Sequence, residues 1–168
     1  MLLRIIKTIL FLCSLCVGFS NAFSQNTVPQ QWHYDIQCEN IGLDGTKLIK
    51  VWSYSKKEKF PLRQAQKNAI HGMIFKGFSG NATTGCPTQR PLADSPDLES
   101  KQAAFFAAFF ADNGPYQKYV NSTIEETPIE RIRVGKEYKI GIIITVMYSQ
   151  LRKDLERQGI IKPLDAGF

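Results

Sequence analysis

An eleven-residue alternation of apolar side chains near the C-terminal end limits the fold of this chain more than any other feature. Every second residue is aromatic or β-branched: Tyr138, Ile140, Ile142, Ile144, Val146 and Tyr148. A period of two places such residues on one face of a β-strand, whereas a helix would scatter them around its axis. Ile143 and Met147 add apolar groups on the other face. The pattern therefore predicts a central strand covered in part on both sides.

Other segments supply neighbours for this strand. Alternation from Trp32 to Cys38 and a β-branched and aromatic run at 48–54 flank a glycine-containing turn, which predicts a β-hairpin. A second hairpin is predicted from the strand at 128–134, a turn at Gly135-Lys136 and the central strand.

Three helices are predicted between and after these strands. Apolar residues recur with helical spacing after Pro61: Leu62, Ala65, Ala69, Ile70, Met73 and Ile74. That helix should end near Gly77 and lie on the sheet, with His71 as a hydrogen-bonded, partly covered residue at the margin of its apolar stripe. A second helix is expected between a cap at Asp94 or Ser95 and the stop at Asn113-Gly114-Pro115, and a third after a cap at Ser149, ending in a glycine-terminated cap at Gly159.

The predicted order is thus β-β-α-loop-α-β-β-α, an α+β fold. It consists of an antiparallel sheet of about four strands with helices mainly on one face. Residues 32–168 are long enough for one such domain and too short for two ordinary ones.

The N-terminal residues have the pattern of an export signal. Residues 1–22 carry two cations, an apolar stretch and a small-x-small ending at Ala22, which predicts a secretory signal peptide. Residues 23–31 are polar and aperiodic, and we expect a flexible lead there. No later segment reaches the length of a membrane span without charges. The protein is therefore expected to be exported, either to the periplasm or to the cell surface or medium.

Signal cleavage would leave two cysteines, Cys38 and Cys86, in an oxidising compartment, where a disulfide between them is the expected state. The alternatives are a nucleophilic cysteine assisted by His33 or His71 and a zinc site. Neither is favoured. A nucleophilic cysteine would need a lowered thiol pKa and a base in contact, and the spacing lacks the close ligand pairs of zinc sites. We expect neither a metal nor a cofactor.

The charge balance gives little support to a nucleic-acid partner. Loss of Arg4 and Lys7 with the signal would lower the net charge from +6 to +4. The densest basic run, at 56–59, contains an acid and no aromatic residue, so a solvated turn explains it better than a nucleic-acid groove. Peripheral association with an anionic membrane surface remains an open alternative.

Two regions are candidates for binding. The predicted second helix contains four phenylalanines, Phe105, Phe106, Phe109 and Phe110, which either pack into the core or present an exposed face to a partner. The loop at 78–96 is rich in Gly, Thr and Pro and contains Cys86, and long loops in compact domains are often functional.

No catalytic motif was found: the chain lacks nucleophile-elbow, phosphate-loop, dinucleotide and zinc-protease patterns. The leading hypothesis is a non-catalytic envelope protein that binds or helps assemble another protein. The first alternative is a small-molecule or glycan binder that uses the 78–96 loop and exposed aromatics such as Trp52 or Tyr116. The second is an enzyme with a carboxylate-based site.

Four segments carry a resemblance to known sequences: FSNAFSQ at 19–25, GTKLIKVW at 45–52, AQKNAI at 65–70 and LRKDLE at 151–156. Together they resemble uncharacterised exported proteins of Bacteroidota. More distantly, the strand followed by an alanine-spaced helix is similar to small envelope modules of the flagellar-assembly lipoprotein type. The first resemblance implies export and no particular activity. The second implies a role in protein assembly, although the chain lacks the usual lipidation site of those modules.

Overall fold

The structure is a computed structural model and describes residues 32–121 and 129–163. The predicted signal peptide at 1–22 and the lead at 23–31 lie outside the described residues.

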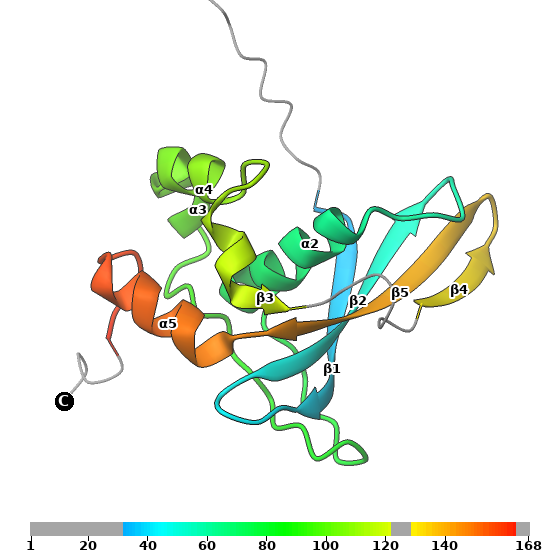
Figure 1. Cartoon of the computed structure of the whole chain (residues 1–168), viewed down its shortest axis with the longest axis horizontal. Helices are drawn as coiled ribbons and strands as arrows, with labels where there is room; N and C mark the ends of the chain where they lie inside the picture. The colour runs from blue at the N-terminus through cyan, green and yellow to red at the C-terminus, as the bar shows by residue number, and fades with distance from the viewer. Residues whose placement is uncertain (1–31, 122–128, 164–168) are drawn as a thin grey trace, which may run out of the picture. The chain divides into compact units, whose positions relative to one another are not determined.

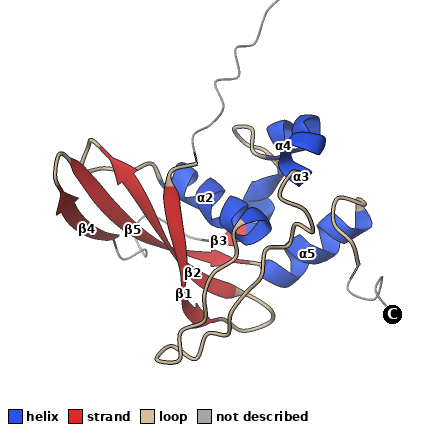
Figure 2. Ribbon diagram, turned by 180° about the vertical axis from the view of Figure 1, so that it is seen from behind, coloured by secondary structure: helices blue, strands red, loops and turns tan. Residues whose placement is uncertain are grey.

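The sheet is antiparallel and five-stranded. Figures 1 and 2 show its strands and the helices beside them. Its strands are β1 (Tyr34–Ile41), β2 (Lys47–Ser55), β3 (Val120–Asn121), β4 (Ile129–Val134) and β5 (Glu137–Val146). β1 pairs with β2 and β2 with β5, while β3 and β4 both pair with the other edge of β5. Both predicted hairpins and the central position of β5 are confirmed. The two-residue strand β3 was not predicted.

The described helices are α2 (Leu62–Phe75), α3 (Leu98–Lys101), α4 (Ala103–Phe109), the 3-10 helix η2 (Pro115–Tyr119) and α5 (Tyr148–Arg157). α2 packs on β1, β2 and β5, and η2 contacts α2, α4 and α5. The predicted α+β class is confirmed.

Two helix predictions need correction. The expected single helix before Asn113 is divided at Gln102, whose φ of −111° and ψ of 33° are not helical, so α3 and α4 are separate short helices. α5 begins at Tyr148 rather than after a cap at Ser149. Its predicted glycine-terminated end is confirmed, because the Ile160 N–H donates to the Leu155 carbonyl and Gly159 adopts a φ of +67°.

The core lies between α2 and the sheet. The apolar stripe of α2 is fully buried at Ala65, Ala69, Ile70, Met73 and Ile74. It faces the alternate residues of β2 and β5 that the period of two predicts: Ile49, Val51, Ile140, Ile142 and Ile144. This burial holds α2 across the sheet, and near the C-terminal end of the helix Gly72 lies against Ile36 of β1, the strand from which the candidate site is built.

Candidate functional site

The loop that follows α2 is ordered by a disulfide and by its own backbone pairing. Cys38, the fifth of the eight residues of β1, is bonded to Cys86, with the two Cα atoms 6.1 Å apart, which confirms the predicted disulfide. Isolated β-bridges join Phe78 to Gln89 and Asn81 to Cys86. The loop is therefore a narrow hairpin held beside the outer edge of β1 (Figure 2).

Between β1 and this hairpin lies an open groove of about 480 Å³. Its lining is mostly polar and comes from β1, the end of α2 and both arms of the hairpin: Asp35, Ile36, Lys76, Gly77, Phe78, Ser79, Thr88, Gln89, Arg90 and Pro91. The volume falls within the range of about 300–1,000 Å³ typical of ligand sites.

One wall of the groove is an unpaired strand edge. The Lys76 ammonium donates to the Tyr34 carbonyl at 2.8 Å, and β1 has no strand partner on that side among the described residues. In an antiparallel strand the backbone groups of alternate residues point the same way. The N–H and C=O of Ile36, two residues further along, therefore point away from β2 at the sheet edge and into the groove.

The sheet register gives the same direction independently. The Met147 N–H donates to the Tyr119 carbonyl, so the backbone groups of Val146 face β2 rather than β3. Val146 lies opposite Lys47 of β2, so the backbone groups of Lys47 face β5. Every second residue of β2 has the same direction in this unbroken register, and Val51 therefore also directs its N–H and C=O at β5. Ile36 of β1 lies opposite Val51 of β2. Because the backbone groups of Val51 face β5, Ile36 forms no backbone hydrogen bonds with it.

The groove carries charges of both signs. Burial lowers the pKa of the Lys76 ammonium, an effect that the nearby Asp35 carboxylate opposes. The same ammonium lies 3.8 Å from the centroid of the Tyr34 ring. Arg90 is exposed, and no described ion pair includes it. The site can thus offer a free guanidinium and a partly desolvated ammonium to a ligand carboxylate.

A buried hydrogen-bond network lies beside the groove, at the N-terminal end of β1. The Tyr34 hydroxyl is hydrogen-bonded to Nδ1 of His71, and Nε2 of His71 lies 3.3 Å from the Glu99 carboxylate. Trp32 stacks on the imidazole at 3.8 Å and donates from its indole N–H to Glu99 at 3.2 Å. The predicted hydrogen bonding of His71 is confirmed, although the side chain is fully buried rather than partly covered.

The Tyr34–His71–Glu99 network has the connectivity of a catalytic triad, but its pKa values do not suit catalysis. Burial, assisted by Glu99, raises the pKa of the Tyr34 hydroxyl, so the phenol is not activated. Burial and the neighbouring Lys76 lower the pKa of His71 to about 3. Because Tyr34 and His71 are only 2% and 4% exposed, no substrate reaches them. Their hydrogen bonds, with that of Glu99, join β1, α2 and α3.

The four candidate phenylalanines lie mostly in the core. Phe106, Phe109 and Phe110 are buried, and Phe105 is half-buried against them. The exposed positions of α4 are alanines. The structure therefore does not present the phenylalanines together as an exposed apolar face.

The expectation that Trp52 and Tyr116 are exposed is wrong. Tyr116 is fully buried, and Trp52 is 9% exposed on the sheet face opposite α2. The Trp52 ring lies over Gly141, where an added Cβ would come within 2.7 Å of it, and Lys50 and Lys139 flank it at 5.7 and 5.2 Å. Both aromatics stabilise the fold and do not offer a ligand-stacking surface.

Sequence reasoning identified the loop but not the groove. No sequence motif contains the groove residues Lys76, Arg90 and Asp35. They lie together only because β1 is at the edge of the sheet, beside the end of α2 and the hairpin. The signal that could have indicated Lys76 is its place directly after the apolar stripe of α2 and just before the expected loop.

Within 32–121 and 129–163, no group of three or more His, Cys, Asp or Glu residues is placed to hold a metal ion. None of the described helices has both the length and the apolar character needed to span a bilayer. Comparison with protein-family models, with curated proteins and with solved structures finds no match.

Proposed function

We propose that this is a non-catalytic exported protein that binds an extended segment of another envelope protein by strand addition to β1. The observation that carries the proposal is the direction of the Ile36 N–H and C=O, which point into a groove with no backbone partner from the described chain. An unpaired strand edge beside a polar cleft is a common template for peptide recognition, in which main-chain hydrogen bonds supply affinity.

The dimensions limit the ligand. The free edge between Tyr34 and Cys38 spans about 13 Å at the usual rise of a strand, which accommodates three to four residues of an added strand. Arg90 and Lys76 on the groove wall favour a segment that carries a carboxylate. Export rests on the signal-like pattern at 1–22, which predicts that the partner is met outside the cytoplasm.

The test uses octapeptides selected from a random display library, measured against the wild-type protein and two proline variants. Ile36→Pro removes the N–H by which β1 would pair with an added strand, and edge strands accept proline where the N–H faces outward. We expect binding to fall at least tenfold. Arg131→Pro, which removes an outward N–H of the opposite edge strand β4, is the matched control and should bind as the wild type does.

Two further readouts separate this proposal from loss of fold. Circular dichroism and urea unfolding should show that both variants remain folded. In the wild type, peptide binding should slow hydrogen exchange at the Ile36 amide. Failure to select any peptide, unchanged binding by folded Ile36→Pro, or protection confined to other amides would each contradict the proposal.

A second candidate function uses the same groove. Its volume and mixed polarity also suit a small polar ligand with a carboxylate. Such a ligand would raise the unfolding midpoint and bind Ile36→Pro as well as the wild type, because it needs no strand pairing. Arg90→Glu should weaken binding in both cases, whereas the proline variant distinguishes them.

A further inference from the structure

The end of the sheet opposite the disulfide-bonded hairpin gathers six cations, which we call the basic tip: Lys56, Lys57, Lys59, Arg131, Arg133 and Lys136. Strand register brings them together. Tyr138 of β5 lies opposite Ser55, the last residue of β2, on one side and opposite Arg133 of β4 on the other. The Arg131 guanidinium also donates to the Glu58 carbonyl at 3.1 Å, which joins β4 to the loop after β2.

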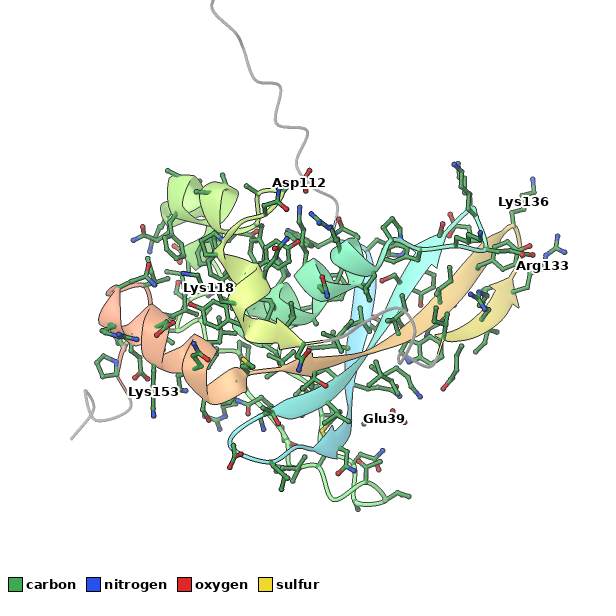
Figure 3. All side chains as sticks on the ribbon, in the orientation of Figure 1. Glu39, Asp112, Lys118, Arg133, Lys136 and Lys153 are labelled. Carbon is green, nitrogen blue, oxygen red and sulfur yellow. A yellow bond between two sulfur atoms is a disulfide. The ribbon has the colours of Figure 1, made fainter. Side chains whose placement is uncertain are left out.

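The charge of the basic tip is poorly balanced. Among the described residues its acidic neighbours are Glu58, Glu130 and Glu137. The Glu130 carboxylate is paired with Lys50 at 2.7 Å, and the Glu58 carboxylate accepts a hydrogen bond from the Tyr138 hydroxyl at 3.0 Å. All six cations are exposed, and none forms an ion pair with a carboxylate of the described residues. Figure 3 shows Arg133 and Lys136 together at this end, far from Lys118 and Lys153 beside the helices.

Exposed apolar side chains accompany these cations. Ile132 and Val134 of β4 are 50% and 51% exposed on the sheet face opposite α2, and Arg131 and Arg133 alternate with them along this edge strand on its other face. Uncovered apolar residues next to unpaired cations are the combination found where soluble proteins contact an anionic lipid surface. Lys and Arg approach the headgroups while the apolar side chains enter the interface.

We propose that the basic tip binds the headgroups of an anionic phospholipid surface. The tip gives little support to nucleic acid, because its exposed apolar side chains, Ile132 and Val134, are aliphatic, while the Tyr138 ring is half-buried and its hydroxyl is bonded to Glu58. Pairing of β4 with a second copy is disfavoured. In the two antiparallel registers that overlap β4 most fully with β4 of a second copy and continue the sheet, Arg131 would lie opposite Arg131 or Arg133 of the other copy.

The test measures co-sedimentation with vesicles of phosphatidylcholine alone and of phosphatidylcholine with 30% phosphatidylglycerol, on protein recovered from the envelope of an expressing bacterium. The test variant is Lys57→Gln/Arg133→Gln/Lys136→Gln. The matched control, Lys118→Gln/Lys153→Gln/Lys162→Gln, removes the same charge from exposed positions elsewhere. At about fivefold in affinity for each cation, the test variant should bind the anionic vesicles about 100-fold more weakly than the wild type.

The expected result is binding to anionic vesicles only, retained by the control and strongly reduced as salt shortens the Debye length from about 10 Å at 0.1 M to about 3 Å at 1 M. Ile132→Ser/Val134→Ser should also weaken vesicle binding without changing the salt dependence, a readout that a general polyanion site would not show. Equal losses in the two triple variants, no binding to anionic vesicles, or tighter binding to a single-stranded oligonucleotide would overturn the proposal.

Discussion

Acidification should destabilise this protein through one buried histidine. His71 is 4% exposed and lies among Trp32, Phe75 and Phe110, with Tyr34 and Glu99 hydrogen-bonded to its two nitrogens. Glu99 would favour the charged ring, but its side chain is 40% exposed, and burial of the imidazole outweighs it. The folded protein therefore keeps His71 neutral.

The magnitude follows from the two protonation equilibria. The pKa of His71 is lowered from its ordinary 6.5 to about 3 on folding, so between these values the unfolded chain binds the extra proton. Stability from this residue is complete above pH 6.5 and decreases as the pH falls towards 3. The linkage relation gives a loss of about 2 kcal/mol between pH 8 and pH 5, and about 5 kcal/mol at its limit.

The assay is urea unfolding at pH 8 and pH 5 for the wild type, His71→Gln and His33→Gln. Gln offers both a donor and an acceptor in place of the ring nitrogens and does not titrate. The difference between the two pH values should shrink by about 2 kcal/mol in His71→Gln and stay unchanged in His33→Gln, which alters an exposed histidine.

A direct measurement covers the case in which His71→Gln does not fold. Nuclear magnetic resonance of the wild-type imidazole should show no protonation of His71 between pH 8 and pH 4.5. A titration midpoint above pH 6, or an unchanged pH dependence in folded His71→Gln, would refute the reasoning.

Two further predictions concern stability. Replacing both Cys38 and Cys86 by Ala should lower the free energy of unfolding in urea by about 4 kcal/mol, because the disulfide closes a loop across a sequence separation of 48. The reduced wild type should show the same loss. A loss below about 1 kcal/mol would contradict the entropic account. Gly141→Ala should lower the free energy of unfolding by about 1–3 kcal/mol, because the added Cβ would meet the Trp52 ring. Trp52→Leu in the same protein should recover part of that loss. Purely additive effects of the two substitutions would show that the contact is not the cause.

Predictions from the sequence succeeded where the determining interactions are local. The period of two at β5 and the helical stripe of α2 each follow from a repeating backbone geometry, which decides the buried face before any partner is known. The division of the second helix at Gln102 was not visible, because no proline or glycine marks it.

Burial of the aromatic residues could not be judged in the same way. Trp52 lies on the solvent side of its strand by periodicity, and only Gly141 on the neighbouring strand lets its ring lie flat and become covered. The phenylalanines of α4 were equally compatible with core and with interface. Their burial depends on η2 and α2, which reach them from other parts of the chain.

By itself the sequence determined the fold class, the principal strands and helices, and the cysteine pair, because each depends on residue spacing or on counting residues. The tertiary structure alone decided that β1 is an edge strand, that Ile36 directs its backbone groups into a groove with Lys76 and Arg90, and that six cations from separate segments meet at one end of the sheet. Strand order and register are set by packing between distant segments, which no local pattern encodes.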